Sequence, residues 1–144
     1  VLSVQAIIAE TGLDPSKWPT EKHFSSWLGL SPANKITGGK VYSTQTRKVN
    51  NRAAIVFRTS AVAVGKSKTA LGAFYRRLKS RSGAMLAITA TARKLACTFY
   101  SLLKNGNEYV EKGMTEYEDR YRDRVVKNLT RRAKELGFSL IQAA

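Results

Sequence analysis

The residues with the clearest chemical potential lie in one short segment, residues 34–40 (NKITGGK). There a threonine hydroxyl stands directly before two glycines and between two lysines. Glycine backbone can approach a phosphate closely, Lys35 and Lys40 could hold its oxygens, and the Thr37 hydroxyl could then attack phosphorus. The same residues could equally form a plain tight turn. The spacing is not that of a P-loop, so the segment alone leaves both interpretations open.

The region around this segment lacks acidic residues. Between Lys22 and Asn107 there is no Asp or Glu, although these 86 residues contain 16 of the 25 Lys and Arg. A domain with balanced charge would have about ten acids there. Cations without carboxylates suit a phosphate backbone, and the net charge of +15 favours nucleic acid as the partner.

A metal site is not expected in this chain. The acid-free region cannot supply carboxylate ligands, and the single His23 lies 74 positions from the single Cys97. His23 is expected to cap or pack in a short helix. Cys97 stands in an apolar stretch and is expected to be a small core residue.

Two groups of cations are candidates for contacts with nucleic acid, and ordinary solvation is the alternative for each. One group surrounds the glycine pair, and the other falls on a predicted helix. The candidates are Lys35, Lys40, Arg47, Lys48 and Arg52 in the first group, and Arg76, Arg77, Lys79 and Arg81 in the second.

The elements that must position these residues are mostly helices. A 3.6-residue apolar period, with capping residues and glycines at its ends, predicts helices near 1–11, 20–28, 51–64, 68–80, 84–104 and 115–136. The last of these is expected to open with a capping box at 115–118. The period disappears over 33–50, which predicts an irregular basic loop or a small β-hairpin. We therefore expect a compact all-α domain of about six helices.

The apolar faces of these helices also predict a core. Its expected members are the larger side chains that recur at helical spacing: Trp27, Leu28, Phe57, Leu71, Phe74, Leu95, Phe99 and Leu129.

The charge distribution suggests an internal division. Residues 1–107 form the expected core with its basic loop, and 108–144 a helical extension that is nearly neutral, with seven acids and eight bases. The whole chain, 1–144, is expected to be a single C-terminal domain excised from a longer protein. No apolar run approaches 18 residues and no signal peptide is visible, so a cytoplasmic location without membrane contact is expected.

Several stretches resemble one family of proteins. The chain is similar to the C-terminal transposase domain of the bridge-RNA-guided insertion-sequence transposases, over nearly its entire length and with consistent spacing. The matching stretches are 24–32 (FSSWLGLSP), 36–40 (ITGGK), 46–54 (TRKVNNRAA), 70–78 (ALGAFYRRL), 87–96 (AITATARKLA) and 108–110 (EYV).

The resemblance implies a DNA recombinase that works with a structured noncoding guide RNA and forms a covalent protein–DNA intermediate. It also implies a RuvC-like DEDD domain in the same protein, which would hold Mg²⁺, and a homo-oligomeric active complex in prokaryotic cytoplasm, associated with the nucleoid. The family's nucleophile is a serine directly before the glycine of this loop, and Thr37 stands at that position. Threonine keeps the hydroxyl but adds a methyl group that stiffens χ1.

Other assignments remain open from the residues alone. Ser31 and Ser43 are nearby hydroxyls that could replace Thr37 as nucleophile. The domain could also bind nucleic acid without taking part in chemistry, or it could serve chiefly in oligomerisation. The Thr37 hydroxyl distinguishes a strand-transfer enzyme from these two non-catalytic functions, because only the enzyme requires it.

Overall fold

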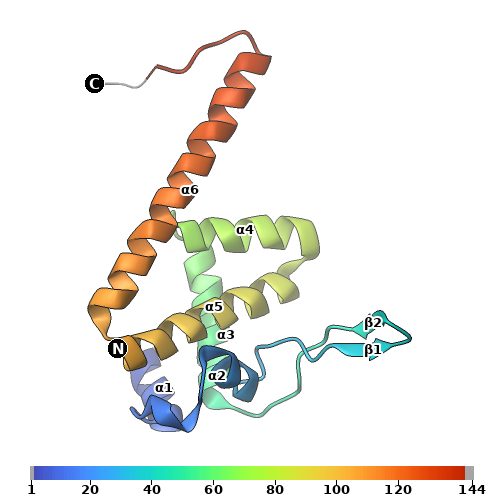
Figure 1. Cartoon of the computed structure of the whole chain (residues 1–144), viewed down its shortest axis with the longest axis vertical. Coiled ribbons are helices and arrows are strands. Elements are labelled where there is room, and N and C mark those ends of the chain that lie inside the picture. Colours follow the sequence, from blue (N-terminus) through green and yellow to red (C-terminus); the bar gives the residue numbers. More distant parts are fainter. Residues whose placement is uncertain (1, 142–144) are drawn as a thin grey trace. The chain divides into compact units, whose positions relative to one another are not determined.

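The computed structural model describes residues 2–141 and consists of helices with one small hairpin (Figure 1). In chain order the elements are α1 (Leu2–Thr11), a 3₁₀ turn η1 (Pro15–Lys17), α2 (Glu21–Trp27), β1 (Lys35–Thr37), β2 (Lys40–Ser43), α3 (Arg52–Gly65), α4 (Ala70–Ser82), α5 (Ala84–Asn105) and α6 (Asn107–Glu135). The all-α class, the helix number and the hairpin within 33–50 are therefore confirmed.

Side-chain caps explain where three of the helices begin. Thr20 accepts a hydrogen bond from the His23 backbone N–H at the start of α2, and Asn51 accepts one from Ala54 N–H at 3.2 Å at the start of α3. The Thr69 hydroxyl accepts from Gly72 N–H at the start of α4. These caps satisfy N–H groups that lack a helical partner, so the chain restarts its helices at predictable places.

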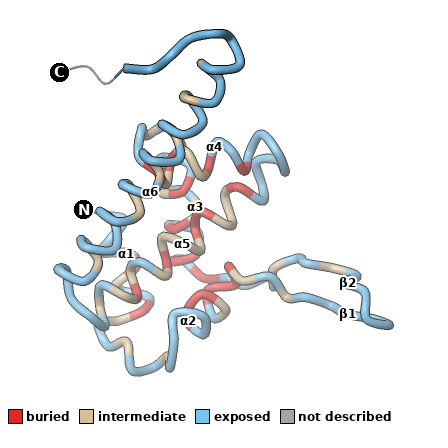
Figure 2. The backbone as a smooth tube through the Cα atoms, turned by 45° about the horizontal axis from the view of Figure 1, so that its top comes forward, coloured by how far each residue is buried: buried red, intermediate tan, exposed pale blue. Residues whose placement is uncertain are grey.

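The main core lies where α2, α3 and α5 come together, and Figure 2 shows buried residues on these helices. Among the described residues, Phe24 packs against more aromatic rings of this core than any other. The Phe24 ring is 1% exposed and lies 4.8 Å from the ring of Trp18, 5.8 Å from Tyr100 and 6.5 Å from Phe57, measured between centroids. The Tyr100 hydroxyl donates to the Trp18 carbonyl at 2.7 Å. This aromatic cluster joins the segment before the hairpin to the two central helices.

The predicted core is correct in part. Leu28 and Phe57 are buried, and Leu71, Phe74, Leu95 and Phe99 are half-buried. The prediction that Trp27 and Leu129 are buried is wrong: Trp27 is 37% exposed and Leu129 is 52% exposed. Trp27 is the last residue of α2; its ring packs against those of Trp18 and Phe24 but stays partly open to solvent. Helix α6 buries none of its residues. Helical spacing predicts which face is apolar, and burial depends on what packs against it.

The predicted start of the last helix is also wrong. Thr115 does not cap a helix, because α6 already begins at Asn107, directly after Gly106 ends α5 with φ +81°. The Thr115 hydroxyl instead donates to the Glu111 carbonyl one turn earlier, at 2.9 Å. A threonine that bonds in this way is tolerated inside a helix. The capping-box sequence at 115–118 therefore lies within α6 and does not mark its start.

The described chain divides into two compact units, one ending at Val110 and the other beginning at Glu111. In the first unit the hairpin extends away from the helices α1–α5 (Figure 1). Among the helices of residues 2–141, none combines the length and the apolar character that crossing a membrane requires.

Candidate nucleic-acid interface

Thr37 lies at the tip of the hairpin. β1 and β2 pair antiparallel, with Ile36 opposite Val41 and Thr37 opposite Lys40. The two turn residues, Gly38 and Gly39, have φ values of +56° and +75°, which a two-residue hairpin turn of type I′ requires and which only glycine adopts without strain. A Cβ atom at either glycine would meet nothing within 4 Å, so the tip stands in open space.

The pairing brings Thr37 and the two predicted lysines together. Lys40 is the direct cross-strand partner of Thr37, and Lys35 lies two residues earlier in the same strand. Because side chains alternate along a strand and opposed residues share a face, all three lie on one face. All three are exposed, and the Thr37 hydroxyl has no hydrogen-bond partner elsewhere in residues 2–141. The Thr37 hydroxyl and the two lysines are thus exposed on the same face of the hairpin.

The opposite face of the hairpin is apolar. Ile36 is 63% exposed and its cross-strand partner Val41 is 56% exposed. Between Lys35 and Ile36 the register shifts, because Ser43 and Val41 pair with these successive residues and Tyr42 is left as a bulge. One face of the hairpin is therefore apolar, and the other carries the Thr37 hydroxyl and the two lysines.

The two alternative nucleophiles are already hydrogen-bonded. The Ser31 hydroxyl lies 2.9 Å from that of Ser25, which is buried, and the Ser43 hydroxyl accepts from Gln45 N–H at 3.3 Å. Of these three candidate hydroxyls, only that of Thr37 is exposed and without a hydrogen-bond partner in the described residues, and it has lysines two residues before it and opposite it.

At the base of the hairpin the chain forms an open hollow of about 520 Å³. Its lining contains three cations and no acid, namely Thr46, Arg47, Lys48, Val49, Asn50 and Arg58. The prediction included Arg47 and Lys48 but missed Arg58, which lies in the middle of α3 and is half-buried. Sequence offered no signal for it, because Arg58 is one of 16 cations in the acid-free region.

The predicted cations on α4 do not form one patch. Arg77 and Arg81 are separated by four residues and share one face, while Arg76 and Lys79 are separated by three and lie on another. All four are exposed. Arg76 also has a structural role, because its Nη1 donates to the carbonyls of Gly65, the last residue of α3, and of Ser67, just beyond it. Arg52, the first residue of α3, is exposed.

Among the described residues outside the hairpin, the Cys and His side chains are both in structural environments. Burial, and secondarily the charge of Glu21, raises the pKa of the Cys97 thiol, which reduces its thiolate fraction at neutral pH. His23 Nδ1 lies 2.8 Å from the Thr20 hydroxyl at the start of α2, so this side chain takes part in the helix cap as predicted. Within residues 2–141 no three His, Cys, Asp or Glu side chains cluster as metal ligands would.

Comparison with known proteins identifies the family of the chain. The model of the IS116/IS110/IS902 transposase family matches residues 2–76, just over half of the chain, including the hairpin and all of α3. Neither the curated proteins nor the solved structures contain a match. Because this family model matches more than half of the chain, the chain belongs to the IS116/IS110/IS902 transposase family.

Proposed function

We propose that this chain is the strand-transfer module of a DNA transposase and that Thr37 is its nucleophile. The observation that supports the proposal most strongly is the position of the Thr37 hydroxyl: exposed, without a partner in the described chain, and on one hairpin face with Lys35 and Lys40. A phosphodiester placed against this face would meet a hydroxyl and two cations that can neutralise its non-bridging oxygens.

In the proposed step the Thr37 Oγ1 attacks phosphorus in line. A bond forms between Oγ1 and phosphorus, and the bridging P–O bond opposite to it breaks. The hydroxyl proton passes to a base, and the departing strand oxygen takes up a proton to become a hydroxyl. The product is a covalent phosphothreonyl link to one DNA end, which conserves the energy of the phosphodiester for rejoining.

The base must come from outside the acid-free region. The acids nearest to Thr37 in sequence are Glu21 and Glu108, and the hairpin itself has no carboxylate or imidazole. The hairpin residues therefore do not fit a Mg²⁺ site, since that ion prefers carboxylate oxygens. We propose that a RuvC-like domain of the same protein supplies both the Mg²⁺ site and the proton acceptor. We also propose that a structured guide RNA and a second copy of the protein complete the active complex.

The test is a substitution series at Thr37 in the full-length protein, measured by recombination and by trapping of covalent protein–DNA adducts. Thr37→Ser is expected to retain or raise both signals, because serine keeps the hydroxyl and removes the β-methyl. Thr37→Val is nearly isosteric but lacks the hydroxyl, and it is expected to abolish both signals while leaving DNA binding intact.

Thr44→Val serves as the matched control, because it removes an exposed hydroxyl from the same loop without touching the tip. It is expected to remain active. An active Thr37→Val variant would remove Thr37 from the mechanism. The domain would then fit the alternative function, binding and positioning nucleic acid without chemistry of its own.

A further inference from the structure

The hollow at the base of the hairpin differs from the other basic surfaces because two of its cations are held in place. Arg47 Nη2 donates to the Ser26 carbonyl at 2.7 Å, and Arg58 Nη2 donates to the Gly29 carbonyl at 3.4 Å. The Ser26 carbonyl belongs to the last turn of α2, where the helix dipole is negative and favours cations, and the Gly29 carbonyl lies two residues beyond the helix end. Each carbonyl oxygen accepts from a charged donor, which makes these two hydrogen bonds strong ones and holds both guanidinium groups in place.

The anchored arginines still have donors to offer. A guanidinium carries five N–H groups in a rigid plane, so one bond to a carbonyl leaves most of them available. Because each side chain is already oriented, less conformational entropy is lost when an anion binds than for a free surface lysine. Both side chains line the same hollow, together with the exposed Lys48.

The backbone around the hollow is also fixed. Gly29 has φ +66°, and a Cβ atom there would lie 2.7 Å from Val49 Cγ2 and 3.0 Å from the Arg47 carbonyl. The chain after the hairpin therefore lies directly against the end of α2. Asn51 then caps α3, so the segment that lines the hollow is held at both ends and the hollow exists before any ligand arrives.

We infer that this hollow binds a single backbone phosphate of a nucleic-acid strand, shared between Arg47 and Arg58. Its open volume of about 520 Å³ accommodates the phosphate with its sugar, and no acid of the lining opposes an anion. The inference rests on the proposed function and adds a second binding site for the strand, separate from Thr37 at the hairpin tip. From Lys40, the cross-strand partner of Thr37, to Thr46 the chain covers six residues, which at about 3.3 Å each separates the site from the tip by at most about 20 Å. Arg47 and Arg58 are thus positioning residues for the strand.

The experiment counts phosphates by the salt dependence of binding. The 144-residue chain is titrated onto a fluorescently labelled DNA duplex between about 50 and 200 mM NaCl, and log K is plotted against log [NaCl]. Each neutralised phosphate contributes about 0.9 to the slope. If one phosphate is shared, the double variant Arg47→Gln/Arg58→Gln loses about 0.9 in slope, and near 0.1 M salt its affinity falls about tenfold.

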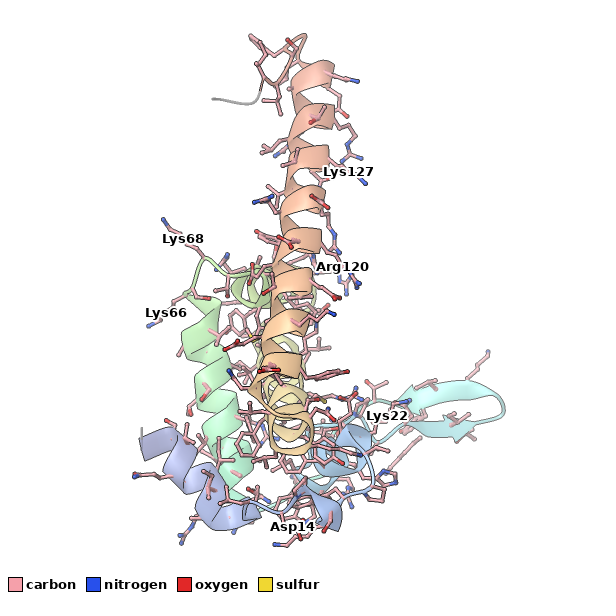
Figure 3. All side chains as sticks on the ribbon, turned by 60° about the vertical axis from the view of Figure 1, so that its left-hand side comes forward. Asp14, Lys22, Lys66, Lys68, Arg120 and Lys127 are labelled. Carbon is pink, nitrogen blue, oxygen red and sulfur yellow. The ribbon has the colours of Figure 1, made fainter. Side chains whose placement is uncertain are left out.

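The matched control is Lys66→Gln/Lys68→Gln, which also removes two charges. Figure 3 shows these lysines where α3 ends and α4 approaches, away from the hairpin. The control is expected to keep the wild-type slope. A loss of about 1.8 in the arginine double variant would mean two separate phosphates and overturn the shared site. An unchanged slope would overturn the site altogether, while the proposed function would stand.

A second pair of substitutions covers the case in which the glutamine variants do not fold, which circular dichroism detects. Arg47→Lys/Arg58→Lys keeps both charges but replaces two forked donors with two point charges. It is expected to keep the slope and to bind several-fold more weakly. Unchanged affinity would contradict the inference. A wild-type chain that does not bind DNA would instead contradict the proposed function itself.

Discussion

The hairpin region (33–50) and helix α6 are both exposed and rich in cations, but only α6 also contains acidic residues. Neither region contains a buried residue. The hairpin region has four cations and no acid, whereas α6 has eight cations and seven acids. In α6, Arg120 lies 3.5 Å from Glu116 and Arg131 lies 3.8 Å from Glu135, each pair spanning one helical turn.

This difference shows which exposed cations point to an external partner. The cations of α6 can be neutralised within their own helix, where such pairs support the helix and need no ligand. The cations of the hairpin have no acid of their own region, so an anion must come from another molecule or domain. The number of cations alone would have ranked α6 first. The absence of acids ranks the hairpin first.

The largest expected effect concerns the packing that supports each region. Leu28 is fully buried at the end of α2, just before the chain leaves for the hairpin, while Leu129 on α6 is 52% exposed. Leu28→Ala is expected to lower the free energy of unfolding by about 2–5 kcal/mol, because it removes core contacts and leaves a cavity. Leu129→Ala is expected to change it by less than about 0.5 kcal/mol.

Urea denaturation of both variants, followed by circular dichroism, measures these changes. Similar losses for the two leucines would mean that α6 is packed against a partner in solution. The difference between the regions would then lie in charge alone.

A second comparison uses one glycine from each region. Gly39 has φ +75°, so Gly39→Ala forces a left-handed residue with a side chain and costs about 1–2 kcal/mol. Gly113 lies inside α6, where an added Cβ meets nothing within 4 Å, and Gly113→Ala is expected to stabilise the helix by about 0.5–1 kcal/mol. Amide hydrogen exchange should therefore become faster in β1–β2 for the first variant and slower in α6 for the second. Slower exchange in the hairpin of Gly39→Ala would rule out the type I′ turn.

The smallest expected effect concerns the ion pairs of α6. Glu116→Gln removes the partner of Arg120, and exposed pairs one turn apart are worth about 0.3–0.5 kcal/mol. The α6 amides should exchange up to about twofold faster at low salt, and the difference should vanish at high salt. A larger loss that persists in salt would show that Glu116 has a role beyond this pair.

Much of this architecture follows from local signals in the sequence. Thr20 and Asn51 cap α2 and α3 where the sequence predicts these helices to start, because a cap depends on residues within one turn. The paired glycines predict a turn for the same reason. Features that depend on distant contacts could not be predicted this way: the central role of Phe24 needs rings from α3 and α5, and the role of Arg76 needs the end of α3.

The candidate site shows the same limit. The positions of Thr37, Lys35 and Lys40 in one segment were visible from sequence, and pairing of adjacent strands placed them on one face. Arg58 joins Arg47 only because α3 packs beside the chain that returns from the hairpin. The returning chain is held close to the end of α2 by the contact of Gly29 with Val49, and no spacing in the sequence predicts this contact.

The most direct test of the account is a salt titration of DNA binding with two matched variants. One replaces the hairpin cations Lys35, Lys40, Arg47 and Lys48 with Gln, and the other replaces four α6 cations, Arg122, Arg124, Lys127 and Arg132, with Gln. Both lose four positive charges, so net charge cannot explain a difference. The hairpin variant is expected to lose about two to three units of log–log slope, and the α6 variant is expected to keep the wild-type slope. Equal losses in the two variants, or a loss confined to the α6 variant, would contradict the claim that the acid-free hairpin is the nucleic-acid interface.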